Sequence, residues 1–150
     1  MKKTIFITGA AKRIGKEIAL CFSEMGWNII IHYNSSKNDA QVLADEINGT
    51  NPDSVITVQG NLDVKEDVEK VINEVRDAFP TIDLLINNAS TFYPTPIEDI
   101  SEEHWDKLVG SNLKGPLFLI KGLKDKLKES KGSIINICLL YTSDAADDRD

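Results

Sequence analysis

Glycines and basic residues stand together near the start of the chain, in the segment TGAAKRIG at residues 8–15. The segment follows a short apolar run and precedes helical spacing, so its backbone N–H groups would lie between a strand end and a helix start, where phosphate groups bind. Gly9 permits a tight turn and Gly15 allows close helix packing, but Arg13 replaces the middle glycine of the usual dinucleotide loop. The segment predicts a pyrophosphate site; the alternative is a glycine turn into an ordinary helix.

A second polar segment, HYNSSK at residues 32–37, follows the second apolar run. An NAD site usually has an Asp or Glu here, which binds both ribose hydroxyls and repels a 2′-phosphate. This segment has no acid, and it supplies hydrogen-bond donors and a positive charge from His32, Asn34, Ser35, Ser36 and Lys37. The pattern favours NADPH as the cofactor. The alternative is a polar turn that caps a helix.

Short apolar runs alternate with amphipathic segments along most of the chain. The runs are apolar on both faces, as buried parallel strands are, and occupy residues 4–8, 27–33, 54–59, 82–87 and 132–137. Between them, apolar residues recur at helical spacing: Ile14, Ile18, Cys21, Phe22 and Met25, then Leu43, Ala44 and Ile47, then Val64, Val68, Val71, Ile72 and Val75. This alternation predicts an α/β fold, a Rossmann-type doubly wound parallel sheet in one domain.

Charge and cysteine content exclude several classes of protein. The net charge is −7, of which residues 144–150 contribute −3, so residues 1–143 carry −4; this argues against a nucleic-acid surface. The apolar run Ile5–Ile7 is too short for a signal peptide or membrane span. Cys21 and Cys138 have no metal-ligand spacing, and we expect Cys21 to be a buried thiol. We therefore expect a cytoplasmic protein without a metal site.

The segment LLINNAS at residues 84–90 adds a second motif to the glycine loop. Together with SNLKGP, which contains Asn112, these motifs resemble the short-chain dehydrogenase/reductase family: Thr8, Gly9 and Gly15 match its loop, and Asn87, Asn88 and Ala89 match its fourth-strand motif. The resemblance covers residues 1–137 in the right order. It implies hydride transfer with a nicotinamide cofactor, and a homotetramer built on the helical region 101–130, which Gly110, Gly115 and Pro116 interrupt.

Two stretches resemble a narrower group, the pteridine reductases, including dihydromonapterin reductase-like enzymes. They are TGAAKRIG with its Arg13 and NNASTFYPTP at residues 87–96. By this resemblance Arg13 and Ser90 would face the pterin and the cofactor phosphates, and Phe92 would stack on the pterin ring, which gains about 0.5–1.5 kcal/mol beyond burial. The alternative is that Phe92 packs on Pro94 and Pro96.

The resemblance implies a set of cofactor contacts and one catalytic residue. Asn61 stands where the family often has an Asp that reaches the adenine amino group, and an amide oxygen can accept the same bond. Asn112 would hold a water in the proton relay. The expected cofactor contacts are Thr8, Gly9, Lys12, Arg13, Ile14, Gly15, His32, Tyr33, Asn34, Ser35, Ser36, Asn61, Leu62, Asn88, Ala89 and Ser90.

The family's proton donor is a Tyr with a Lys four residues later, whose charge lowers the phenol pKa. Here Cys138 and Leu139 follow the fifth run, and Tyr141 is followed four residues on by Ala145, with no Lys after Lys131. The segment CLLYTSDAAD at residues 138–147 is identical to a translated transposase end and adaptor used in preparing DNA sequencing libraries. We therefore expect residues 138–150 to be a non-native tail; a natural divergent C-terminus is the alternative.

These observations lead to a main expectation with alternatives. The intact protein is expected to be an NADPH-dependent short-chain reductase of a dihydropterin or dihydrofolate, with 3-oxoacyl carrier-protein reductase or another carbonyl reductase as the alternative. A nucleotide-binding module without catalysis is the alternative of another class. The fold would be truncated after the fifth strand and this chain inactive. Exposed apolar surface would cost on the order of 10 kcal/mol, so the chain is expected to aggregate or stay partly unfolded.

Overall fold

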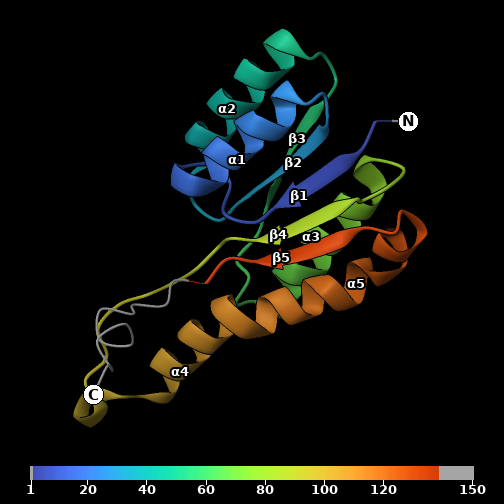
Figure 1. Cartoon of the computed structure of the whole chain (residues 1–150). Coiled ribbons are helices and arrows are strands. Elements are labelled where there is room, and N and C mark those ends of the chain that lie inside the picture. Colours follow the sequence, from blue (N-terminus) through green and yellow to red (C-terminus); the bar gives the residue numbers. More distant parts are fainter. Residues whose placement is uncertain (1, 139–150) are drawn as a thin grey trace, which may run out of the picture.

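Five parallel strands form the centre of the protein in the computed structural model, which describes residues 2–138 (Figure 1). Their order across the sheet is β3-β2-β1-β4-β5. The strands are β1 (Thr4–Ile7), β2 (Asn28–Tyr33), β3 (Val55–Gln59), β4 (Leu84–Asn87) and β5 (Ser133–Asn136). Each lies within one of the apolar runs identified in the sequence. The predicted α/β fold with a doubly wound parallel sheet is confirmed.

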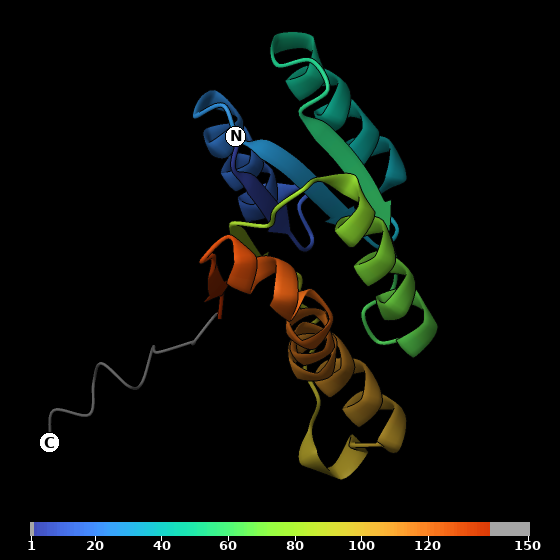
Figure 2. The same ribbon diagram turned by 90° about the vertical axis from the view of Figure 1, so that its right-hand side faces the viewer.

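Helices cover both faces of this sheet, as Figures 1 and 2 show: α1 and α2 lie on one face, and α3 and α5 lie on the other. Their bounds are α1 (Arg13–Glu24), α2 (Lys37–Thr50), α3 (Lys65–Ala78), α4 (Glu102–Val109) and α5 (Gly115–Glu129). A 3-10 turn, η1 (Ile97–Asp99), precedes α4. In the part of the chain that the structure describes, no helix has the length and apolar character needed to cross a membrane.

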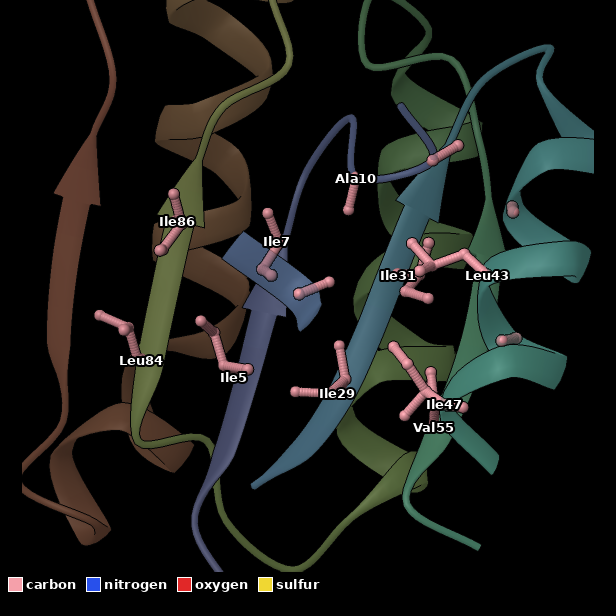
Figure 3. Close-up of a cluster of buried hydrophobic side chains, with 14 residues drawn as sticks. Ile5, Ile7, Ala10, Ile29, Ile31, Leu43, Ile47, Val55, Leu84 and Ile86 are labelled. Atoms are coloured by element: carbon pink, nitrogen blue, oxygen red, sulfur yellow. The ribbon is translucent and has the colours of Figure 1, made fainter. Parts of the chain in front are cut away.

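Alternation of side chains along the strands explains the two layers of helices. Ile5 and Ile7 of β1 belong to the buried cluster beneath α1 and α2, whereas Phe6 belongs to the cluster beneath α3 and α5. Figure 3 shows the first cluster, in which Leu43 of α2 packs toward Ile31 of β2. Because successive residues of a strand point to opposite faces, a strand buried on both faces must be apolar throughout.

The strand order reverses next to β1. The chain passes from β1 to β2 and β3 on one side, and then crosses to β4 and β5 on the other. The loops that follow β1 and β4 therefore start side by side at the carboxyl edge of the sheet and lead to helices on opposite faces. Doubly wound folds bind their ligands in the crevice at this reversal, so the two motifs found in the sequence meet where a ligand site is expected.

The long helical region is interrupted by a π-helical turn, η2 (Gly110–Lys114). Proline has no N–H group, so Pro116 cannot form the regular α-helical hydrogen bond to the carbonyl group of Asn112. A Cβ atom added to Gly115 would lie 2.8 Å from the carbonyl oxygen of Leu62, so glycine lets this turn approach the loop after β3. The sequence showed an interruption, but it did not show that the interruption is a π turn.

The structure contradicts the expectation that Cys21 is buried, because its thiol is exposed. The buried positions of α1 are Gly15, Ala19 and Ser23, which repeat every four residues. Cys21 is two residues from both Ala19 and Ser23, and a rotation of about 100° per residue places it on the opposite side of the helix. Phe22 packs against the core beside this stripe, which explains the apolar series in the sequence.

Apolar side chains form an exposed surface along both faces of β5 and the outer side of η2 and α5. Leu117 is 58% exposed and Ile135 is 47% exposed, and Leu113 and Ile134 are exposed as well. Ile134 and Ile135 lie on opposite faces of the sheet, since Ile134 pairs with Leu85 and Ile135 with Ile86. Large apolar surfaces that face water favour association between molecules.

We expect the 150-residue chain to associate through this surface as its concentration rises. Replacing both Leu117→Lys and Ile135→Lys introduces charges there and should keep the chain monomeric, whereas Val42→Lys, at an exposed position of α2, should change nothing. Size-exclusion chromatography with light scattering measures the mass. A double variant that associates as strongly as the unmodified chain would refute the expectation.

Candidate functional site

Thr8 fastens the loop after β1 to the loop after β4. Its buried hydroxyl oxygen accepts hydrogen bonds from the backbone N–H groups of Asn88 and Ala89, both at 2.9 Å. The backbone N–H of Thr8 donates to the carbonyl oxygen of Ile86 at 3.0 Å. One side-chain oxygen thus satisfies two N–H groups that parallel pairing alone would leave without partners.

Asn88 strengthens the same junction from the other side. Its Nδ2 donates to the carbonyl oxygens of Thr8 and Gly9, at 2.9 and 3.1 Å. Gly9 has a φ of +63°, and a Cβ atom there would lie 2.9 Å from Cα of Ala89. A Cβ atom on Gly15 would lie 2.6 Å from the Gly9 carbonyl oxygen. Both positions require glycine, because the two loops and α1 approach each other too closely for any side chain.

His32 lies at the carboxyl end of β2 and is 2% exposed. Its Nδ1 accepts a hydrogen bond from the Gly9 N–H at 3.2 Å, and its Nε2 lies 2.9 Å from the Gly60 carbonyl oxygen, so Nε2 carries the proton and donates. Burial lowers the pKa of His32 to about 4, although the bond to Gly60 opposes this shift. Both ring nitrogens of His32 therefore bind the protein itself, and the predicted contact of His32 with a cofactor remains a prediction.

A hollow of about 130 Å³ lies beside this junction. It brings together seven residues of the loop after β1 and the segment after β2: Gly9, Ala11, Lys12, Tyr33, Asn34, Ser35 and Ser36. Six of these seven were predicted cofactor contacts, and Ala11 was not. Within residues 2–138, hydroxyl and amide groups and one ammonium group line the hollow, and no carboxylate does. This donor set suits an anionic group such as a phosphate.

An acid lies close to the hollow, although the segment after β2 contains none. The carboxylate of Asp39 lies 3.0 Å from Nζ of Lys12, and both side chains are about half exposed. Asp39 occupies the first turn of α2, where an acidic residue interacts favourably with the helix dipole. Its place in a first helical turn is enough to account for an acid in the sequence. The contact with Lys12 cannot be seen there, because it depends on how α1 and α2 pack.

Arg13 adopts a left-handed backbone conformation, with a φ of +53°, at the first residue of α1. This conformation costs a residue with a Cβ atom about 1–2 kcal/mol, and it explains why the usual loop has glycine at this position. Arg13 and the following Ile14 are both exposed. Strain of this kind is found at functional sites, so it supports a ligand contact for Arg13. The predicted contacts of both residues with a cofactor remain predictions.

Asn61 and Leu62 follow directly after β3 and Gly60, and neither lines the hollow. Oδ1 of Asn61 accepts from the N–H of Asp63 at 3.1 Å, which leaves it one lone pair for a further donor. Leu62 is buried in the cluster beneath α3 and α5. Its side chain therefore belongs to the core, and only its backbone could contact a cofactor.

Asn112 ties the π turn to the loop after β4. Its Nδ2 donates to the carbonyl oxygen of Thr91 at 2.7 Å, and its Oδ1 accepts from the N–H of the same residue at 3.1 Å. The side chain of Asn112 thus positions the segment that holds Ser90 and Phe92. Ser90 is exposed, and Phe92 is 74% exposed. Water binding by Asn112 and pterin contacts of Ser90 and Phe92 remain predictions.

Tyr93 anchors the segment that presents Phe92, and the sequence analysis did not identify it. Its ring is partly buried and meets the ring of His104 edge to face, with 5.6 Å between the ring centroids. The adjacent Phe92 is exposed. The ring of Tyr93 thus packs against α4, whereas the ring of Phe92 is exposed. The sequence alone does not show which of these two adjacent rings is buried.

A larger hollow, of about 300 Å³, lies between the loop after β3 and α4. It contains none of the predicted site residues and is lined by Asp63, Trp105, Asp106, Val109, Gly110 and Lys114. Burial raises the pKa of Asp63, although the charge of Lys107 opposes this. Leu139 and Tyr141, which the sequence analysis considered for the missing proton donor, lie outside the residues that the structure describes.

Known proteins are similar to this chain over most of its length. A family model described as short chain dehydrogenase matches residues 3–146. The 3-oxoacyl-[acyl-carrier-protein] reductase FabG of Staphylococcus aureus (strain N315) is 34% identical over 138 residues, which are 91% of this chain and 56% of that protein. An NAD-dependent glycerol dehydrogenase of Listeria innocua serovar 6a is 34% identical over 136 residues, which are 90% of this chain and 52% of that protein.

Solved structures agree with these matches. FolM alternative dihydrofolate reductase 1 of Brucella suis, in complex with NADP, superposes with a TM-score of 0.82 and 30% identity, covering 89% of this chain and 56% of that one. The chain therefore spans a little over half the length of the relatives it matches. The family match continues past Ile137, and no comparison supports the adaptor interpretation of residues 138–150.

Removing the hydroxyl group of Thr8 should loosen the junction between the two loops. Thr8→Val keeps the shape but leaves the N–H groups of Asn88 and Ala89 without an acceptor, so we expect the free energy of unfolding to fall by about 2–3 kcal/mol. Thr8→Ser retains the hydroxyl group and should lose less than half as much. Urea unfolding of both variants measures the difference, and equal losses would contradict the role of the hydroxyl group.

The low pKa of His32 makes the fold sensitive to acid. The pKa is about 4 in the fold and 6.5 as the ordinary value, so between these values the unfolded chain binds more protons. The contribution of neutral His32 is complete above pH 6.5 and is lost at up to about 1.4 kcal/mol per pH unit as the pH falls toward 4. Unfolding at several pH values should show this loss in the unmodified chain and not in His32→Asn. Parallel curves for the two proteins would exclude His32 as its source.

Proposed function

The chain belongs to the short-chain dehydrogenase family, and on that premise we propose that the whole protein is an NADPH-dependent reductase of a pterin, of the dihydropterin or dihydrofolate type. The observation that carries the proposal is Arg13, an exposed cation held in a strained backbone conformation where the usual loop has glycine. The likeness to FolM alternative dihydrofolate reductase 1 of Brucella suis points in the same direction.

The hollow beside Gly9 fits the 2′-phosphate of NADPH. Lys12 contributes a positive charge, and Ser35 and Ser36 contribute hydroxyl donors, while the nearby carboxylate of Asp39 is bonded to Lys12. The pyrophosphate would lie over the loop between β1 and α1, where the N–H groups at the start of α1 face the crevice. Bound NADPH supplies the hydride.

The pterin would lie above the end of β4. Phe92 offers an exposed ring for stacking, and Arg13 offers donors for the oxygen and nitrogen atoms of the heterocycle. Ser90 would donate or accept one further hydrogen bond. Asn112 holds the backbone of Thr91, and so fixes the loop on which both Ser90 and Phe92 stand.

The remaining parts of the proposal concern the whole protein. A Tyr with a Lys four residues later would donate the proton, as the family resemblance implies, and this chain by itself would be inactive. The helical region of α4, η2 and α5 would form the contacts of a cytoplasmic homotetramer. Sequencing the source DNA across the codon of Ile137 tests the first of these statements: a frame that continues into Tyr-x-x-x-Lys supports catalysis, and a genomic CLLYTSDAADDRD favours a nucleotide-binding module without it.

A second candidate function is that of a 3-oxoacyl carrier-protein reductase, because FabG of Staphylococcus aureus is 34% identical to this chain. Oxidation of NADPH by the whole protein distinguishes the two. Turnover with a dihydropterin is the result we expect. Turnover with an acetoacetyl thioester and with no dihydropterin would refute the pterin assignment.

The strain at Arg13 leads to a specific prediction for this chain. Arg13→Gly removes both the strain and the charge, so we expect it to raise the free energy of unfolding by about 1 kcal/mol and to weaken NADPH binding about tenfold. Arg13→Lys keeps the charge and the strain, and it should weaken binding less and leave stability unchanged. Urea unfolding and fluorescence titration with NADPH measure the two effects. A glycine variant that binds NADPH as tightly as the unmodified chain would remove Arg13 from the site.

A further inference from the structure

His32 joins three strand ends that are distant in the sequence. Its ring lies at the end of β2, accepts from Gly9 in the turn after β1, and donates to Gly60 directly after β3. Its own carbonyl oxygen accepts from the N–H of Ala10 at 2.9 Å. Two consecutive N–H groups of the glycine turn are therefore bound to one residue of the neighbouring strand.

These bonds determine the shape of the hollow. With the N–H groups of Gly9 and Ala10 directed at His32, the turn bends so that Gly9, Ala11 and Lys12 form one wall of the hollow. Tyr33, which follows His32, begins the opposite wall. The His32 side chain is buried and does not line the hollow, and its two ring nitrogens bond to the backbone of Gly9 and Gly60. Any change that releases Gly9 would therefore shift one wall relative to the other.

We propose that His32 is a positioning residue for the cofactor: in its neutral form, with the proton on Nε2, it holds the glycine turn in the conformation that binds NADPH, and protonation of the ring releases the turn. A protonated ring carries hydrogens on both nitrogens, so Nδ1 could no longer accept from Gly9, and two N–H groups would face each other. The inference rests on the proposed cofactor and is independent of the proposed pterin substrate.

Among the residues that the structure describes, no charged side chain is hydrogen-bonded to the imidazole, and desolvation is the largest cause of its low pKa. Charged groups on the segments around it include Lys12 before α1, Lys37 and Asp39 in α2, and Asp67 and Lys70 in α3. Lys12 and Asp39 neutralise each other. The acid response of the turn is therefore assigned to His32 itself.

Three substitutions separate the two hydrogen bonds of the ring. In His32→Asn, Oδ1 takes the place of Nδ1 and can accept from Gly9. In His32→Gln, the longer amide can reach Gly60 but leaves Gly9 without its acceptor. His32→Leu keeps the bulk and makes neither bond. We expect NADPH affinity at neutral pH to stay within about threefold in the Asn variant and to fall about tenfold or more in the Gln and Leu variants.

The experiment is a fluorescence titration of the 150-residue chain with NADPH, in dilute solution, from neutral pH down to about pH 3.5, so that it passes through the His32 pKa of about 4, with circular dichroism recorded at each point. Titration of the 2′-phosphate affects all variants equally. The informative quantity is therefore the NADPH dissociation constant of the unmodified chain divided by that of His32→Asn at each pH. We expect the unmodified chain to lose affinity on acidification more steeply than the Asn variant does. If the Leu and Gln variants do not fold, the comparison of the unmodified chain with His32→Asn still tests the proposal.

Two results would overturn the proposal. Folded Gln and Leu variants that bind NADPH as tightly as the unmodified chain would show that the bond to Gly9 does not position the turn. Identical pH profiles for the unmodified chain and His32→Asn would show that the imidazole does not control it. An unmodified chain that fails to bind NADPH at neutral pH would instead overturn the cofactor assignment on which the inference rests.

Discussion

The turn between β1 and α1 has backbone groups that the sheet cannot satisfy, and the site depends on how the protein satisfies them. Asn88, in the loop after β4, donates to the carbonyl oxygens of Thr8 and Gly9, and the Thr8 hydroxyl oxygen accepts from the N–H groups of that loop. His32 of β2 accepts from the N–H of Gly9. Each of these side chains is at least partly buried, so an unmade bond would cost a full desolvation penalty. Gly9 and Gly15 make the arrangement possible because no side chain fits where these segments meet. The turn is thereby shaped before any ligand arrives, which lowers the entropic cost of binding.

This rigid turn explains how the strain at Arg13 can persist. A left-handed residue with a side chain relaxes unless its surroundings hold it, and here the loop is fixed on one side by β2 and β4 and on the other by α1. The opposite wall of the crevice is fixed separately, because Asn112 binds the backbone of Thr91 through both atoms of its amide. The glycine turn and the loop after β4, which the proposed function assigns to the cofactor and the substrate, are thus held by different elements, α1 and the π turn.

The sequence predicted the sheet because buried parallel strands are apolar on both faces, and this pattern survives any detail of packing. It also placed the glycine turn, which depends on adjacent residues, whereas the hollow depends on the pairing of β1 with β2. It could not assign His32 or Asp39, whose partners, Gly60 and Lys12, are brought near only by the packing of strands and helices. Cys21 was misassigned because helical spacing shows that a helix has an apolar side but locates that side only to within one residue. The π turn depends on a similar tertiary contact, between Gly115 and the loop after β3.

The central claim is that the edge of the sheet forms a preshaped site for a phosphorylated nicotinamide cofactor. The most direct test compares the dissociation constants of NADPH and NADH for the same chain at neutral pH and at two salt concentrations. The account predicts that NADPH binds at least about tenfold more tightly, and that salt reduces this preference because charge-assisted contacts to the 2′-phosphate produce it. Equal affinities, or tighter binding of NADH, would contradict it, and would mean that Lys12 and its neighbours do not recognise the 2′-phosphate.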